Sequence, residues 1–420
     1  MPATSKKLFT VADSPANQLS FYHLALLLLS LPYDRFYSHL ILISFLLHTL
    51  VNLRKGEIKP VFTLSNLALA SVFFVTVAGT LYSSNKPMAF NEWAKQITLL
   101  LFPLALCLNP IDLKKYRDKL LYIFAIGSAV TILYLYLEAL RTIRFYHLPL
   151  SALVSADFTN HNFSGPLDIH ATFFSMQIAV ALVFLISQLV KGNGSKILNI
   201  VCCAILSVGI IQLASKSVFI ALLIIINICL PYFLLKGTAR WRFAAITVSL
   251  SVLVFAGIYS LGNFKERYIN DLKTDLSKAK ADELFDPRLA RWQVALKLVG
   301  QAPIIGHGSG TEVGLLKQRF FEARFYRSYL AGLNAHNQYI SFLIKTGIIG
   351  LLVYLATLYF GFGRALRRRD VLLLAFMVIV ATVSFSENFL DVDKGIFFYA
   401  VFFSLFLFSE KEDTLSTTDK

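Results

Sequence analysis

One apolar segment of the chain begins with a histidine and an asparagine, in the stretch HNQYISFLIKTGIIG that starts at His336. In a helix that turns by about 100° per residue, Gly347 and Gly350 lie about 20° and about 40° from His336. Small residues on that face let a neighbouring helix approach closely. The positive end of the helix dipole favours a neutral imidazole and an anionic ligand. His336, with Asn337 beside it, is therefore a candidate general base, and the alternative is a histidine that only caps a helix.

A second candidate group lies upstream, where Arg288, Arg291 and Trp292 precede the glycine-rich stretch GQAPIIGHGSG. Asp286 followed by Pro287 predicts the start of a helix. The apolar stripe expected on this helix consists of Leu289, Trp292, Leu296 and Val299, with Lys297 on the opposite face. Guanidinium groups one turn apart at a membrane surface suit a phosphate or diphosphate, and the alternative is contact with lipid headgroups.

Three further positions could contribute to chemistry. Lys216, in LASKSV, is an isolated cation between two apolar runs. A lysine in such a place either has a function or extends its side chain so that the ammonium group lies at the membrane surface. Glu387, with Asp391 and Asp393, could orient the histidine or the arginines, or could form a solvated turn. His170, at the start of an apolar run, is open to both interpretations.

Several common catalytic patterns are absent from the sequence. It contains no Walker motif, no HExxH and no nucleophile elbow, which disfavours an ATP-driven pump. No paired-aspartate motif lies in a soluble domain, so a nucleotide-sugar-dependent transferase is also disfavoured. The four cysteines show neither CxxC spacing nor nearby histidine pairs, and neither a metal site nor a cofactor is expected.

The composition shows what must position these residues. Of the 420 residues, 56% are hydrophobic and only 15% are charged, against roughly a quarter charged residues in soluble domains. Such a chain predicts an all-α polytopic membrane protein. The net charge of +15 lies in short tracts between apolar runs, so we interpret it as a topology signal and expect no nucleic-acid partner.

Apolar runs long enough to span a bilayer predict about twelve transmembrane helices, and ten or eleven remain possible because two runs are short. The runs lie near residues 17–32, 36–53, 61–82, 92–108, 117–141, 167–190, 196–213, 215–235, 240–261, 336–363, 370–386 and 391–409. Residues 262–335 form one long loop that contains the amphipathic helix. The tail 410–420 is polar and expected to be disordered.

Lysine and arginine are concentrated in alternate loops, for example at 114–119 and 364–369. This positive-inside pattern places both termini in the cytoplasm and the loop 262–335 in the periplasm. The candidate catalytic residues then face the periplasm.

Several of these motifs together resemble the O-antigen ligase and O-antigen polymerase family. The resemblance rests on H-N-x9-G-x-x-G at 336–350, on DPRLARW with IIGHGSG, and on SENFLDVDKGIFFYAVFF. LASKSV lies where the family usually has a serine-arginine pair, so Lys216 replaces an arginine and one diphosphate contact is in doubt. The similarity covers roughly residues 165–410.

The resemblance implies a metal-independent, inverting glycosyltransferase of the bacterial inner membrane. Its donor would be a glycan linked to undecaprenyl diphosphate, and its acceptor lipid A–core or a growing glycan. Arg288, Lys216 and Arg291 would bind the diphosphate and His336 would be the catalytic base. Asn337, Trp292, Gly347, Gly350 and Glu387 would support them.

The sequence leaves the exact reaction open. O-antigen ligation is favoured over polymerisation, and transfer of a glycan to protein is a related variant. A membrane transporter or flippase is the alternative from another class. A transporter is expected to have charged or glycine-broken helices near the middle of the bilayer, whereas the candidate residues here are expected at its outer surface.

Overall fold

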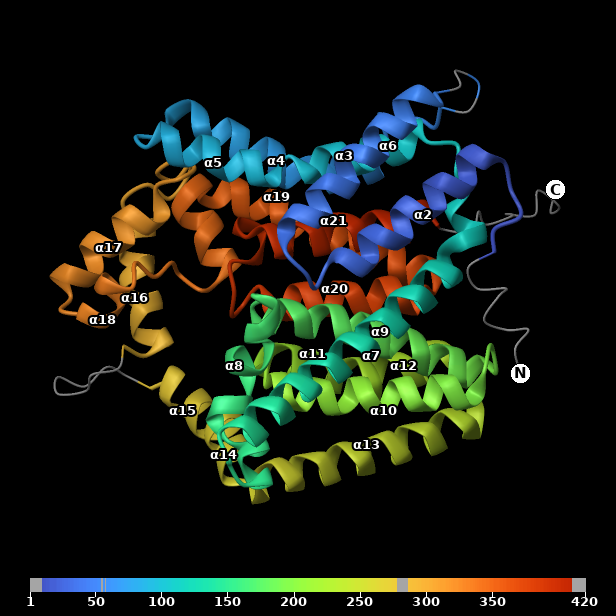
Figure 1. The fold of residues 1–420 in the computed structure, drawn as a ribbon. Helices are drawn as coiled ribbons and strands as arrows, with labels where there is room; N and C mark the ends of the chain where they lie inside the picture. Colours follow the sequence, from blue (N-terminus) through green and yellow to red (C-terminus); the bar gives the residue numbers. More distant parts are fainter. Residues whose placement is uncertain (1–9, 54–55, 57, 278–285, 410–420) are drawn as a thin grey trace.

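The computed structural model describes residues 10–53, 56, 58–277 and 286–409, and the part of the chain that it describes contains helices and no strand (Figure 1). The predicted tail 410–420 lies outside the described residues. The first half contains α2 (Pro15–Ser30), α3 (Arg35–Val51), α4 (Leu64–Tyr82), α5 (Lys86–Gln96), α6 (Thr98–Leu108), α7 (Leu113–Phe145), α8 (Asn160–Ser164), α9 (Ala171–Lys191) and α10 (Lys196–Leu213).

The second half continues with another set of helices. They are α11 (Lys216–Ile224), the π-helix η5 (Ile225–Cys229), α12 (Leu230–Leu234), α13 (Gly237–Ser260), α14 (Gly262–Lys265), the π-helix η6 (Glu266–Asn270), α15 (Asp271–Asp275), α16 (Arg288–Val299), α17 (Glu312–Glu322), α18 (Tyr326–Leu330), α19 (Gln338–Arg368), α20 (Val371–Val383) and α21 (Asp393–Phe408).

Each of the twelve predicted apolar runs contains one helix or consecutive helices. Seven of the described helices are long and apolar enough to cross a membrane, namely α4, α7, α9, α10, α11 with its continuation through α12, α13 and α19. Two shorter apolar helices are α3 and α20. The protein is therefore an all-helical membrane protein, while the count of twelve spans stays a prediction.

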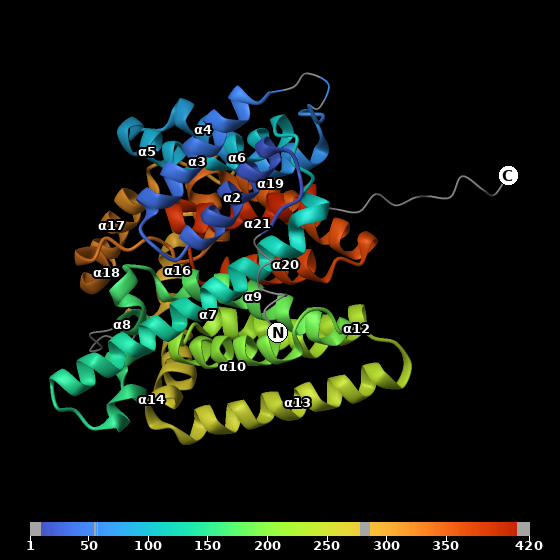
Figure 2. The same ribbon diagram turned by 45° about the vertical axis from the view of Figure 1, so that its right-hand side comes forward.

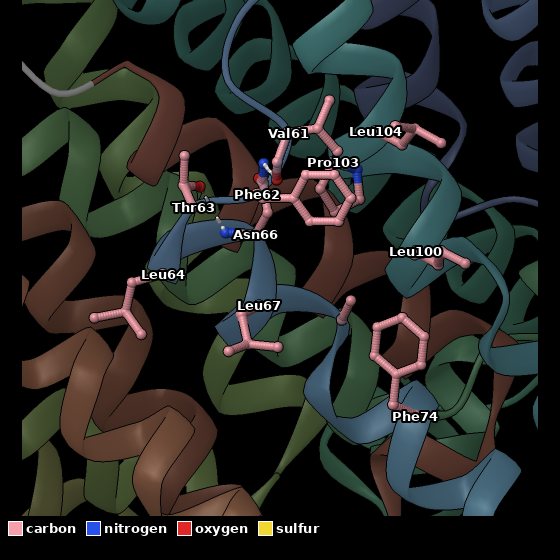
Figure 3. A pocket seen from close by; sticks show the side chains of 11 residues that line it. Val61, Phe62, Thr63, Leu64, Asn66, Leu67, Phe74, Leu100, Pro103 and Leu104 are labelled. Carbon is pink, nitrogen blue, oxygen red and sulfur yellow. Dashed lines mark hydrogen bonds between the residues drawn. The ribbon is translucent and has the colours of Figure 1, made fainter.

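The predicted run 92–108 differs in detail, because it holds two helices. Asn85 caps α5 through its side chain and Pro87 lies in the first turn, so this helix begins before the apolar run. The second helix, α6, contains Pro103, which lacks the backbone N–H for an intrahelical bond. An apolar groove of about 440 Å³ lies between α4 and α6 at this proline (Figure 3), away from the candidate residues.

The hydrophobic core runs between the long helices, with α9 and α21 at its centre. Both are buried along almost their whole length, whereas α13 lies along the outside of the bundle with apolar side chains exposed (Figures 1 and 2). Exposed apolar side chains on a helix of this length are suited to lipid.

The helices run between two ends of the molecule. One end holds α8 and α14 to α18, and we call it the loop end (Figure 1). At the other end, which we call the terminal end, Arg117 at the start of α7 forms two hydrogen bonds of 2.6 and 2.8 Å with the carboxylate of Asp370. Lys119 donates to the carbonyl of Thr10 there, and Arg117 also lies over the ring of Phe406. The start of α2 and the end of α21 therefore both lie at the terminal end.

Helix α19 is broken at Gly347, where φ is +63° and ψ is −160°. The glycine-rich stretch docks against this break. The N–H groups of Ile348 and Ile349 bond to the carbonyls of Pro303 and Ile304, and Gly308 donates to the carbonyl of Lys345. Three of the four glycines of the stretch, Gly306, Gly308 and Gly310, have positive φ. The expected geometry of one continuous helix face from His336 to Gly350 is therefore wrong, because the chain leaves the helical path at Gly347.

Gly347→Ala is expected to lower the thermal stability of the purified protein strongly. A Cβ at Gly347 would lie 2.2 Å from the carbonyl oxygen of Ile304. A positive φ and overpacking together cost an alanine about 2–5 kcal/mol. Thermal unfolding in detergent measures the change, with Gly257→Ala in α13 as the control, because no atom lies within 4 Å of a Cβ there. Equal melting temperatures for the two variants would contradict the role of the break.

Candidate active site

His336 lies directly before α19 at the loop end, with a left-handed backbone of φ +45°. The N-cap of the helix is Asn337, whose side-chain oxygen accepts from the N–H groups of Tyr339 and Ile340 at 3.0 and 3.1 Å. The N–H of His336 itself donates to the side chain of Asn334 at 3.0 Å. Asn337 therefore caps the helix, and His336 lies just outside it in a left-handed conformation.

The imidazole of His336 faces the carboxylate of Glu387, in the segment between α20 and α21. Nδ1 of His336 lies 3.3 Å from Oε2 of Glu387. In a neutral ring this contact assigns the hydrogen to Nδ1 and leaves Nε2 free to accept a proton. Of the three carboxylates that the sequence offered, Glu387 alone has this contact among the described residues. Asp391 pairs with Lys345 and Asp393 pairs with Arg35 instead.

Glu387 is buried, yet its charged form is favoured. Burial raises the pKa of Glu387, but the hydrogen bond from His336 and the nearby groups of His170, His336 and Arg288 outweigh burial and hold the pKa below its usual 4.5. Glu387 is therefore ionised at neutral pH and can stabilise a positive charge on the imidazole.

Two cations of the predicted set meet at Asp275, the last residue of α15. Nζ of Lys216 lies 3.0 Å from Oδ2 of Asp275, and Nε of Arg288 lies 3.6 Å from the same oxygen. Nη1 of Arg288 also donates to the carbonyl of Ser386 at 3.1 Å, next to Glu387. Lys216 and Arg288, 72 residues apart in sequence, therefore meet at one carboxylate, and Arg288 adjoins the segment that contains Glu387.

Helix α16 begins at Arg288, close to the predicted position, but it buries another face. Asp286 does not cap it; its carboxylate accepts from the backbone and hydroxyl of Ser328 at 2.8 and 2.7 Å. Leu296 of the predicted apolar stripe is exposed, whereas Arg291 is buried with Ala295 and Leu298. The difference arises because α16 packs against α17 and α19 rather than against lipid alone.

Arg291 is a buried cation that has no hydrogen-bonded anion within the described part of the chain. Its Nε and Nη1 have no partner among the described residues, although the side chain is only 6% exposed. Burial and the nearby charge of Arg288 lower the pKa of Arg291 to about 10, so the group remains charged at neutral pH. On the same helix, Nε1 of Trp292 donates to the carbonyl of Ala335 at 2.9 Å. Trp292 therefore ties α16 to the residue that precedes His336.

Two histidines before α9 adjoin this group. The ring centroids of His161 and His170 lie 4.2 Å apart. Nδ1 of His161 accepts from the N–H of Ala171, and Nδ1 of His170 accepts from that of Thr172. Partial burial and the neighbouring His170 lower the pKa of His161 to about 4, and burial lowers the pKa of His170 as well. Both rings are therefore neutral at pH 7 and present an Nε2–H donor.

Sequence reasoning missed several members of this neighbourhood. Asp275 and His161 lie in segments without a motif, and no pattern in the sequence indicates them. Lys345 could have been found, because a lysine within an apolar run of spanning length is unusual. Its side chain is only 5% exposed in α19.

The arrangement combines the parts of a group-transfer site. It contains a histidine backed by a carboxylate, two cations held by one aspartate and a further buried guanidinium. This combination can take a proton from a hydroxyl and stabilise an anionic leaving group.

Comparison with known proteins gives one family match. Residues 201–355 match the family model described as O-antigen ligase. The match supports assigning the chain to the O-antigen ligase and polymerase family. The matched O-antigen ligase segment lies within the stretch on which the resemblance was based, and it contains Lys216, Arg288, Arg291 and His336 but ends before Glu387.

A curated relative extends the comparison without adding an activity. An uncharacterized protein of Haemophilus influenzae is 25% identical over 166 residues, which are 37% of this chain and 42% of that protein. The chain therefore spans about two fifths of the length of the curated relative that it matches.

Proposed function

We propose that this protein transfers a glycan from undecaprenyl diphosphate to an acceptor sugar hydroxyl, and that the reaction is O-antigen ligation to lipid A–core. The observation that carries the proposal is the contact between His336 and Glu387 beside the cations Arg288 and Lys216. The family match supports glycan transfer in general, and the geometry supports a base next to a diphosphate site.

The proposed step is a direct displacement with inversion, without a metal ion. Nε2 of His336 takes the proton of the acceptor hydroxyl as its oxygen attacks the anomeric carbon. The bond from that carbon to the diphosphate breaks, and its electron pair leaves with the diphosphate oxygen. Glu387 accepts the hydrogen bond of Nδ1 and stabilises the imidazolium.

We assign to Arg288, Lys216 and Arg291 the role of stabilising the negative charge that develops on the leaving diphosphate. The first two already share Asp275, so a diphosphate would exchange with or join that carboxylate. Arg291 contributes a guanidinium whose Nε and Nη1 bond to none of the described residues. Lys216 supplies a point charge rather than the planar fork of an arginine.

An apolar groove near Lys216 supports the proposal that the donor is linked to a lipid. Its volume is about 420 Å³, and residues of α9, α10, α11, η5 and α13 line it. Phe219, three residues after Lys216, belongs to this lining and packs against Tyr268. The groove thus offers an apolar path for an isoprenoid chain whose diphosphate lies at Lys216.

We place the protein in the bacterial inner membrane with both termini in the cytoplasm and the site facing the periplasm. The alternation of basic loops supports this orientation. Arg288 begins α16 at the loop end and contacts Asp275, which also binds Lys216, whereas the start of α2 and the end of α21 lie at the terminal end, and this arrangement fits the same topology. Polymerisation of a growing glycan and transfer to protein use the same parts and stay alternatives.

One observation favours the other class of function. Transport proteins often have broken helices with buried charges, and α19 has a break at Gly347 next to Lys345. However, Lys345 is surrounded by carboxylates, and the glycine-rich stretch satisfies the backbone of the break. The charge and the backbone groups at the break are therefore already satisfied by protein groups, which does not favour a substrate site there. A flippase is for this reason the second candidate.

The deciding experiment is the lipopolysaccharide gel profile of the producing bacterium after deletion of the gene. A ligase predicts bare core with accumulated lipid-linked polymer, restored by the wild-type gene. Core that carries single repeat units would instead indicate a polymerase. An unchanged profile would contradict both and favour a protein acceptor or transport.

A further inference from the structure

A buried lysine surrounded by carboxylates lies beneath the proposed catalytic residues. Nζ of Lys345 is 2.7 Å from Oδ1 of Asp391, 3.8 Å from Oε1 of Glu92 and 3.9 Å from Oε2 of Glu312. The Lys345 side chain is 5% exposed and that of Glu312 is 3% exposed. Burying charges in this way is costly unless they are paired, and no step of the proposed reaction uses them.

The cluster is connected to the backbone on both sides of His336. Oε1 of Glu312 accepts from the N–H of Ala335 and from the side-chain amide of Asn388, each at 2.9 Å. Oδ1 of Asn388 accepts from the N–H of Asn337 at 2.8 Å. The residues before and after the histidine are therefore held by Glu312 and Asn388.

The same bonds fix the partner of the histidine. Asn388 directly follows Glu387, and its amide also reaches Asp391 at 3.3 Å. The left-handed backbone of His336 is a conformation that costs of order 1–3 kcal/mol and persists only where neighbouring contacts enforce it. Glu312 and Asn388 make these contacts, and Lys345 holds the carboxylates of Glu312 and Asp391 together.

We propose that Lys345 is a positioning residue for the His336–Glu387 pair, an inference that rests on the proposed glycan transfer. Its ammonium group attracts the carboxylates of Glu312 and Asp391, which would otherwise repel each other or take up protons. Glu312 and Asn388 then accept hydrogen bonds from the N–H groups of Ala335 and Asn337 and so fix the backbone on both sides of the histidine. Lys345 does not touch the substrate.

The test is the rate of glycan transfer by purified Lys345→Met and Lys345→Arg in liposomes that contain the lipid-linked donor. Lys345→Met is expected to lower kcat by about 10–100-fold, because small misplacements of catalytic groups have effects of this size. The KM for the donor should stay within about threefold, because within the described part of the chain Arg288, Lys216 and Arg291 form no hydrogen bond or ion pair with the cluster. Lys345→Arg, which keeps the charge, should restore most of the rate.

A matched control separates positioning from loss of a buried ion pair. Arg117→Met removes a largely buried cation at the terminal end, where it forms two hydrogen bonds with Asp370. Each variant is then combined with Glu387→Gln, which by itself is expected to lower kcat. The effects of Lys345→Met and Glu387→Gln are expected not to add, because both act through the orientation of His336. Those of Arg117→Met and Glu387→Gln should add.

Several outcomes would overturn the inference. They are a wild-type kcat for Lys345→Met, a loss equal to that of Arg117→Met, or full additivity with Glu387→Gln. If Lys345→Met does not accumulate, Asn388→Ala cuts the same connection while leaving Lys345 paired with Asp391. It must show the same loss of kcat and the same non-additivity, and additivity would again reject the role. Absence of transfer by the wild type would reject the proposed function itself.

Discussion

His336→Ala is expected to reduce glycan transfer by about 10²–10⁴-fold, the usual contribution of a positioned general base. With Nδ1 held by Glu387, Nε2 is the nitrogen left to take the acceptor proton. The fall should appear in kcat, because the cations that bind the diphosphate are unchanged. Transfer from a labelled lipid-linked donor to purified acceptor measures it, alongside the melting temperature.

Two controls make the His336 result specific. His336→Asn removes the imidazole with a residue that tolerates a positive φ, so it should be as inactive as the alanine variant without backbone strain. His147→Asn replaces an exposed histidine that also has a positive φ and should transfer normally, as should Lys297→Ala on the exposed side of α16. Normal transfer by either His336 variant would remove the general-base role.

Arg288→Ala is the second variant with a large expected effect. It removes the cation that bridges Asp275 and the carbonyl of Ser386, and with it charge stabilisation of the leaving diphosphate. Loss of one such contact typically costs about 10²–10³-fold in rate. Inhibition by undecaprenyl diphosphate should weaken in parallel, which distinguishes loss of diphosphate binding from loss of the base.

Arg319→Ala is the matched control for Arg288. Arg319 lies in α17 of the same loop and pairs with Glu322 at 2.8 Å, in a surface contact of small energetic value. Arg288→Lys should be intermediate, because an ammonium keeps the charge but not the fork that contacts both partners. An Arg288→Ala enzyme with the rate and product inhibition of Arg319→Ala would remove Arg288 from the diphosphate site.

Much of the helical organisation could be predicted because the bilayer requires long apolar runs. Every predicted run contains helices, and the match of residues 201–355 agrees with the motifs around His336 and Arg288. The contact of His336 with Glu387 joins residues 51 positions apart, and the sequence offered Glu387 only as one of three carboxylates.

The remaining features depend on tertiary contacts that no local pattern encodes. Asp275 meets Lys216 and Arg288 only because the end of α15 lies beside the first residues of α11 and α16. Gly347 occurs in an apolar run, where a glycine predicts close helix packing, and the docked glycine-rich stretch turns that position into a break. The predicted buried face of α16 was wrong for the same reason, because the neighbouring helices decide which face is buried.

The docking of residues 303–310 at the break of α19 also has a consequence for biogenesis. Backbone N–H groups that lack partners are costly within a membrane protein. The carbonyls of Pro303 and Ile304 that satisfy Ile348 and Ile349 belong to a segment that precedes α19 in the chain. During synthesis this segment emerges first, so its carbonyls are already available when α19 enters the membrane. The order of the chain therefore matches the order in which the broken helix needs its partners.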